Sequence, residues 1–225
     1  MPIHRMIISH KYKFIFVRTE KTGGTSLQCA LGEICDPGDV VTGPFQGRAP
    51  DVPRVGNAQR KLRRRFPKYF GLHAHATIGQ VRSIVGDRIF NDYFKFAIER
   101  NPWDRQVSLY AQRKKQYQPG KEFNFHKDLD SLWFRCTEYV RLHNWDIYTI
   151  NNQIAVDKVV RYENLDDEIS EVLSLLGISD SLKMPKRRAG YRNDGGNYRS
   201  LYCDRTRNLV ARWYHREIEA FGYEF

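Results

Sequence analysis

The hydrophobic positions of the chain fall into short apolar runs separated by stretches with helical periodicity. Apolar runs rich in β-forming side chains predict buried strands at residues 13–17, 93–98 and 156–160, with a candidate fourth strand at residues 69–75. Helices are predicted where apolar residues recur every three or four positions: residues 27–32, 77–85, 130–145, 204–220, a segment that begins at Pro102 and a segment capped by Asn164 and closed by Gly177.

Strands that alternate with helices indicate a parallel β-sheet covered by helices on both faces. The chain has 225 residues, of which 41% are hydrophobic, enough for a packed core. The expected fold class is therefore α/β, in a single domain over residues 1–225. Residues 36–68, rich in Gly, Pro and Arg, are expected to form a basic irregular insertion into this domain.

The charge of the chain is concentrated in two segments. Its formal net charge is +11, and residues 48–70 carry a net charge of +7 while residues 183–199 carry +5. The rest of the chain is close to neutral. This distribution favours local capture of anions over a uniformly basic surface that would bind any polyanion.

The cysteines and the apolar segments bear on cellular location and metal binding. The four cysteines form no C-x-x-C pair and no zinc spacing, so we expect reduced thiols and no metal. The apolar stretch after Met6 is short and is interrupted by His10, Lys11 and Lys13, which is unlike a signal peptide. Together with the lack of a run of about 20 apolar residues, this predicts a cytoplasmic protein without a membrane span.

A candidate anion-binding loop follows the predicted strand at residues 13–17, at the strand end where α/β sheets usually bind ligands. Two glycines allow close backbone approach, and the N–H groups of the following helix favour an anion. The lysine precedes the glycines, so the segment is not a Walker A loop. A plain strand-to-helix turn is the alternative interpretation. The loop consists of Lys21, Thr22, Gly23, Gly24, Thr25 and Ser26.

A second motif, ERNPWDRQVSLY, follows the strand at residues 93–98. Asn101 is suited to cap a helix that starts at Pro102, and Arg100 stands at the end of the strand. Arg105 and Ser108 share one helix face, and an arginine with a hydroxyl suits a phosphate dianion. Taken alone, the segment equally fits the start of a salt-bridged amphipathic helix.

Together, KTGGTSL and ERNPWDRQVSLY resemble the two nucleotide motifs of sulfotransferases that use 3′-phosphoadenosine 5′-phosphosulfate (PAPS). The branch most similar contains soluble bacterial carbohydrate sulfotransferases and heparan sulfate 2-O-sulfotransferases. The resemblance extends through HAHAT, VVRYENL and FGYEF. It implies a P-loop-kinase-like architecture, PAPS as donor and a hydroxyl acceptor, expected to be a carbohydrate or glycoconjugate.

The resemblance also implies roles for individual residues. Residues 21–26 would hold the 5′-phosphosulfate, and Arg100 and Ser108 would hold the 3′-phosphate. Many relatives have His-x-Pro before the lysine, where this chain has Arg18, Thr19 and Glu20. The late segment at residues 183–199 resembles the loop that covers the nucleotide in relatives, with Arg187, Arg188, Tyr198 and Arg199 as candidates.

Transfer to a hydroxyl calls for a general base, and histidine is the commonest choice. His73 and His75 end the candidate strand at residues 69–75, and alternate residues of a strand point to one face. Relatives have a catalytic histidine in this segment, which matches His75. His73 is a candidate for acceptor binding.

The basic stretch at residues 48–68 lies between the anion-binding loop and His75 in the sequence, which suggests a mobile lid for an anionic or polyhydroxylated acceptor. Its candidate acceptor-binding residues are Arg63, Arg64 and Arg65. A solvated loop is the alternative interpretation. Two other functions remain open, a nucleotide-dependent kinase and a nucleic-acid-binding protein that uses the basic run. The first lacks a Walker lysine, and the second lacks a recognised reading module.

Overall fold

The computed structural model describes residues 6–41, 76–117, 122, 124–130, 142–178 and 197–225. Its internal contacts divide the chain into two units. The first unit comprises Met1–Glu99 and Asn144–Arg187, and the second comprises Arg100–His143 and Arg188–Phe225. Each unit is described separately below.

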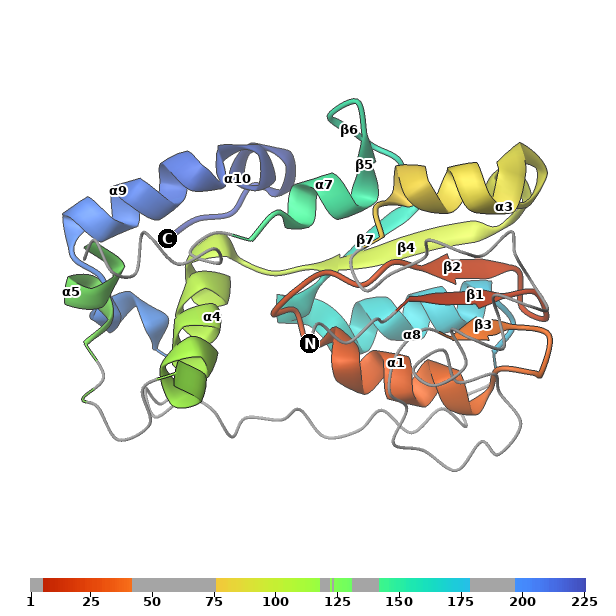
Figure 1. The fold of residues 1–225 in the computed structure, drawn as a ribbon, viewed down its shortest axis with the longest axis horizontal. Helices are drawn as coiled ribbons and strands as arrows, with labels where there is room; N and C mark the ends of the chain where they lie inside the picture. The colour runs from red at the N-terminus through yellow and green to blue at the C-terminus, as the bar shows by residue number, and fades with distance from the viewer. Residues whose placement is uncertain (1–5, 42–75, 118–121, 123, 131–141, 179–196) are drawn as a thin grey trace. The chain divides into compact units, whose positions relative to one another are not determined.

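The first unit is built on a five-stranded sheet with the strand order β3-β1-β2-β4-β7 (Figure 1). Strand β2 pairs in parallel with β4, and β4 in parallel with β7, which confirms the expected α/β class and the three principal predicted strands. The strands are β1 (Ile7–Ser9), β2 (Phe14–Phe16), β3 (Val40–Val41), β4 (Phe94–Glu99) and β7 (Lys158–Arg161).

The sheet is mixed rather than wholly parallel. Strand β1 pairs antiparallel with β2 on one side and with β3 on the other. Only residues 10–13 connect β1 to β2. A parallel pair needs a crossover of a dozen or more residues, so this short connection can only produce a hairpin.

Helices cover both faces of this sheet. Figure 1 shows α1 and α8 on one side and α3 and α7 on the other. The rings of Phe16 and Phe96, paired across β2 and β4, stack with centroids 5.0 Å apart in the core beneath Leu31 of α1 and Val172 of α8. The helices are α1 (Gly24–Glu33), α3 (Ile78–Asp92), α7 (Asn144–Tyr148) and α8 (Leu165–Leu175), with the 3₁₀ turn η2 (Tyr162–Asn164) before α8. A separate two-stranded hairpin consists of β5 (Thr149–Ile150) and β6 (Gln153–Ile154).

Two helix ends differ from the sequence prediction. Thr77 forms a capping box with Gln80 at the start of α3, and the helix continues past the predicted end to Asp92, with a non-helical residue at Gly86. Asn164 occupies the N-cap position of α8, but its side chain makes no capping hydrogen bond there. Gly177 has the predicted left-handed backbone, with φ 66°, just beyond the end of this helix.

The predicted irregular insertion begins with ordered structure. Asp39 is buried and accepts hydrogen bonds from Ser9 Oγ at 2.9 Å, His10 N at 2.6 Å and Asp36 N at 3.0 Å. These bonds hold the start of the insertion against the β1–β2 hairpin, and Val40 and Val41 form strand β3 of the sheet. Residues 42–68 and the candidate strand at residues 69–75 lie outside the described part of the chain.

The second unit is helical. Asn101 Oδ1 accepts the backbone N–H of Trp103 at 3.1 Å, which confirms the predicted cap of α4. The predicted helix at residues 204–220 is interrupted at Tyr214, whose backbone leaves the helical region with φ −121° and ψ 29°. The elements are α4 (Pro102–Tyr117), α5 (Phe125–Asp130), η3 (Tyr198–Leu201), α9 (Asp204–Trp213) and α10 (His215–Phe221).

The predicted helix at residues 130–145 is wrong at its C-terminal end. Leu142 and His143 are not helical, and α7 begins at Asn144. The N–H of Leu142 donates to the hydroxyl of Tyr214 at 3.0 Å instead of to a helical carbonyl. A side-chain acceptor from a distant part of the sequence therefore replaces the local hydrogen bond that the helical pattern predicts.

Candidate functional site

The loop between β2 and α1 has an unusual backbone. Lys21 has φ 62° and Gly23 has φ 75°, so two of three successive residues are left-handed. Glycine tolerates this region, whereas a residue with a side chain is strained there by about 1–3 kcal/mol. The strain at Lys21 requires surrounding interactions that hold the loop in place.

Two buried threonines anchor the base of this loop. Thr19 Oγ1 hydrogen bonds to the carbonyl of Ile98 in β4 and to Thr22 Oγ1, the latter at 2.8 Å. The hydroxyl of Thr22 also donates to Thr19 O at 3.3 Å. The hydroxyl of Thr22 is therefore used in hydrogen bonds within the loop. An anion bound there would contact Thr22 through its backbone N–H.

Asn144 holds the loop from a different element. Its side chain is fully buried at the first position of α7. Oδ1 accepts the N–H of Glu20 at 2.9 Å, and Nδ2 donates to the carbonyl of Glu20 at 3.0 Å. Sequence reasoning missed this residue, because Asn144 lies more than a hundred positions away from Glu20 and belongs to no motif.

The glycines of the loop make room for neighbouring side chains. A Cβ added to Gly24 would lie 2.9 Å from Arg18 Cγ, and one added to Gly23 would lie 3.0 Å from the ring of Tyr162. Arg18 Nη2 donates to Thr25 Oγ1 at 2.8 Å. Arg18 thus adds a second cation to the loop, beside Lys21, which sequence reasoning did not assign to the site. Its place at the carboxyl end of a predicted strand was the available signal.

The loop leads directly into the N-terminus of α1. Gly23 is the N-cap and provides no side-chain cap, and the first turn holds no acidic residue. The N-terminus of a helix carries partial positive charge, and here two half-buried side chains, Thr25 and Ser26, accompany it. A left-handed turn, cationic side chains and a helix N-terminus together form a suitable cradle for a phosphate or sulfate group.

The second motif lies in the other unit and contains two arginines with different environments. Arg105 is fully buried, forms an ion pair with Glu217 at 3.1 Å and lies 4.4 Å from the centroid of the Tyr214 ring. The hypothesis that Arg105 binds a phosphate together with Ser108 is therefore wrong, because the guanidinium of Arg105 is buried in the core and paired with Glu217. Ser108 is half-buried on the same helix.

Arg100 is the remaining arginine of this motif. It is 7% exposed, and its Nε donates to Asp104 Oδ2 at 2.7 Å, one helical turn further on. Asp104 therefore fixes the orientation of the guanidinium group. A preoriented guanidinium is suited to a phosphate oxygen, since less side-chain entropy is lost on binding.

Comparison with known proteins shows the family of the chain. The model of the sulfotransferase family matches residues 4–224. The chain belongs to the sulfotransferase family. An uncharacterized protein of Archaeoglobus fulgidus is 31% identical to this sulfotransferase over 124 residues, which cover 54% of the present chain and 95% of that relative. No solved structure matches the chain.

Several predicted site residues of the sulfotransferase lie outside the described part of the chain. They are His73, His75, Arg63, Arg64, Arg65, Arg187 and Arg188. Within the late segment, the described residues Tyr198 and Arg199 belong to η3, where the guanidinium lies 5.0 Å from the tyrosine ring. Their assignment to nucleotide binding stays a prediction.

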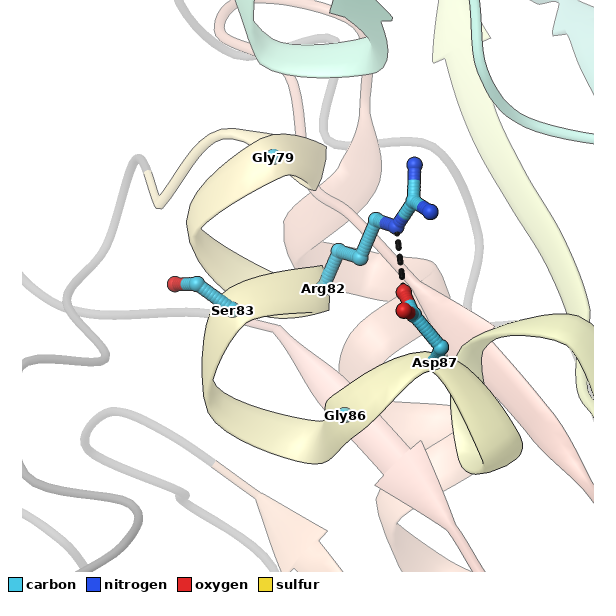
Figure 2. A pocket seen from close by; sticks show the side chains of 5 residues that line it. All are labelled: Gly79, Arg82, Ser83, Gly86 and Asp87. Carbon is cyan, nitrogen blue, oxygen red and sulfur yellow. Dashed lines mark hydrogen bonds and ion pairs between the residues drawn. The ribbon is translucent and has the colours of Figure 1, made fainter.

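A surface pocket of the sulfotransferase lies on α3 (Figure 2). Its lining includes Gly86 and the ion pair of Arg82 Nε with Asp87 Oδ1 at 2.7 Å, with Gly79 and Ser83 completing it. Both charged side chains are well exposed, so water competes for them.

The residues described in the structure contain no cluster of three or more His, Cys, Asp or Glu suited to a metal. None of the described helices is long and apolar enough to cross a membrane.

The contact between Gly24 and Arg18 generates a prediction about stability. Gly24→Ala should destabilise the protein, because the new Cβ displaces Arg18 from Thr25. In an Arg18→Ala background the obstructing Cγ is gone, and Gly24→Ala should be neutral or stabilising by up to about 1 kcal/mol, since alanine favours a helix over glycine. Urea unfolding of the four proteins measures both changes. An equal loss of stability in the two backgrounds would show that the contact is unimportant.

Proposed function

We propose that this sulfotransferase transfers the sulfuryl group of PAPS to a hydroxyl of a carbohydrate or glycoconjugate. The supporting observation is the loop before α1, in which the left-handed backbone at Lys21 and Gly23 coincides with a helix N-terminus and a second cation at Arg18. This combination suits the anionic phosphosulfate group, a mixed anhydride of phosphate and sulfate, better than an uncharged ligand.

In this proposal the loop holds the 5′-phosphosulfate. Backbone N–H groups from Thr22 onward and the hydroxyls of Thr25 and Ser26 donate to its oxygens. Lys21 lies before the glycines, so it reaches the bridging oxygen from the side. Arg18 orients Thr25 through the bond at 2.8 Å and adds positive charge to the loop.

The 3′-phosphate is assigned to Arg100 and Ser108. This assignment depends on the order of the two motifs and on the orientation that Asp104 gives to Arg100. Asp104 also places a negative charge beside the guanidinium group. We therefore expect Arg100 to act mainly through a directed hydrogen bond to the phosphate rather than through its net charge.

PAPS would supply the sulfuryl group and leave as adenosine 3′,5′-bisphosphate (PAP). The base is assigned to His75, which accepts the proton of the acceptor hydroxyl while the new bond from oxygen to sulfur forms. Lys21 and the N–H groups of the loop stabilise the negative charge that develops on the phosphate oxygen as its bond to sulfur breaks. The enzyme's contribution is positioning and charge stabilisation, as in phosphoryl transfer.

The acceptor is assigned by charge. The stretch at residues 48–68, which includes Arg63, Arg64 and Arg65, is strongly basic. Arginine side chains bind carboxylate and sulfate groups through paired hydrogen bonds. An acceptor that already carries such groups, such as an acidic polysaccharide, fits this composition. His73 is proposed to contact the acceptor beside His75.

Ligand discrimination tests the proposed function. PAP should raise the thermal midpoint of the wild-type protein, since a ligand that binds only the folded state stabilises it by mass action. ATP and single-stranded DNA at equal concentration should have much smaller effects. Incubation with PAPS and a panel of acidic and neutral oligosaccharides should yield products heavier by one sulfuryl group in mass spectrometry. A larger shift with ATP than with PAP would favour the kinase alternative.

Two substitutions separate the roles of the lysine and the histidine. Lys21→Ala and His75→Ala should each lower turnover at least about a hundredfold, the usual scale for oxyanion stabilisers and acid–base groups. His75→Ala should leave PAP affinity nearly unchanged, because the base contacts the acceptor. Lys13→Ala removes an exposed lysine of the same unit and should retain full activity. Near-normal turnover of His75→Ala would transfer the assignment of the base to His73.

Arg100→Ala should mainly weaken nucleotide binding. A charge-assisted hydrogen bond to phosphate contributes about 1.5–3 kcal/mol, which corresponds to roughly ten- to a hundredfold in affinity. Titration calorimetry with PAP and with adenosine 5′-phosphate locates the contact, because only PAP carries the 3′-phosphate. Arg113→Ala, on the helix α4 that follows Arg100, is the matched control. Equal weakening of both nucleotides by Arg100→Ala would contradict the assignment.

A further inference from the structure

Asn144 is a buried amide that contacts the backbone of the anion-binding loop at one residue. Its oxygen accepts the N–H of Glu20 at 2.9 Å, and its nitrogen donates to the carbonyl of the same residue at 3.0 Å. The amide is fully buried, so water cannot substitute for either bond without reaching the protein interior. The Asn144 amide thus makes the same pair of hydrogen bonds to the backbone of Glu20 that a residue of a neighbouring β-strand would make.

The carbonyl of Glu20 belongs to the peptide group that leads into Lys21. Its hydrogen bond to Asn144 Nδ2 fixes the plane of this peptide on the N-terminal side of Lys21. On the C-terminal side, Thr22 is anchored through its hydroxyl to Thr19. Lys21 therefore lies between two fixed points, which hold its backbone at φ 62° against the usual preference of a residue with a side chain.

The element that carries Asn144 is itself fixed to the sheet. At the other end of α7, the hydroxyl of Tyr148 donates to Glu99 Oε2 at 3.1 Å, and both side chains are fully buried. Glu99 is the last residue of β4, the strand that also receives the hydrogen bond from Thr19 through Ile98. Strand β4 therefore anchors the loop directly, through Thr19, and also anchors α7, the helix that carries Asn144, through Tyr148.

We propose that Asn144 is a positioning residue that sets the backbone of Lys21 and so aims its ammonium group at the transferred sulfate. This inference rests on the proposed function for the role of Lys21. Asn144 contacts no reacting atom. Its effect on turnover passes through Lys21, because a small displacement of a charge-stabilising group is enough to lower the rate substantially.

Two substitutions and one control isolate this role. Asn144→Ala removes both bonds to Glu20. Asn144→Asp keeps an acceptor for the N–H of Glu20 but loses the donor to its carbonyl, which tests the bond that orients the peptide before Lys21. Thr149→Val removes a hydrogen bond in the adjoining strand, from Thr149 Oγ1 to Trp145 O at 2.8 Å, without touching the loop.

Amide hydrogen exchange measures how rigidly the loop is held, and it can be carried out without PAPS. Amides of residues 19–23 should exchange at least about tenfold faster in Asn144→Ala and Asn144→Asp than in wild type and Thr149→Val. Unchanged exchange in the two Asn144 variants overturns the positioning role. A wild-type protein that fails to bind PAP or to transfer a sulfuryl group overturns the proposed function instead, and it leaves the exchange result unaffected.

Turnover then separates positioning of Lys21 from a general structural role. Asn144→Ala should lower kcat about tenfold or more with little change in the acceptor KM. In a Lys21→Ala background the same substitution should cost less than about twofold, because residues that act through one another are not additive. Equal losses of kcat in both backgrounds overturn the inference, since a structural defect would act whether or not Lys21 is present.

Discussion

The passage of the chain from β2 into α1 is the constraint on which the proposed chemistry depends. The parallel pairing of β2 with β4 places this turn at the carboxyl end of the sheet, and Thr19 ties it to the carbonyl of Ile98. The turn changes direction through left-handed residues, and under the proposed function the first N–H groups of α1 would then face the anion. The buried threonines and Asn144 make an otherwise strained backbone the stable one, so binding does not have to order it.

The second motif shows how one short segment divides its charges between two tasks. Arg105 is buried with Glu217 and Tyr214, where removing either charge would leave the other unpaired in the interior. Arg100 is held by Asp104, and under the proposed function it would bind the 3′-phosphate in that orientation. A guanidinium is planar and always charged, so it suits an ion pair in the core and a phosphate contact equally well, and the two arginines differ in their partners.

The sequence was sufficient to predict the strands that carry the two motifs, the start of α4 and its cap at Asn101, because these depend on local patterns. The interactions that shape the site were not predictable in this way. Asn144 and Glu20 are 124 positions apart and come together only in the tertiary structure. The break of the last helix at Tyr214 likewise accompanies contacts with the distant residues Gln106 and Leu142. The antiparallel side of the sheet was missed because the run at β1 was too short to read as a strand.

The order of the sheet also determines which strands are open to pairing with a strand of another molecule. In the described part of the chain, β3 and β7 form the two edges, and open edges are where strands of other molecules can add. Strand β3 has only two residues, so it offers few backbone groups for pairing. Strand β7 begins with Lys158 and ends with Arg161, and charged side chains on an edge disfavour a second strand. Part of the positive charge of the chain thus lies at a sheet edge, where it opposes edge-to-edge aggregation.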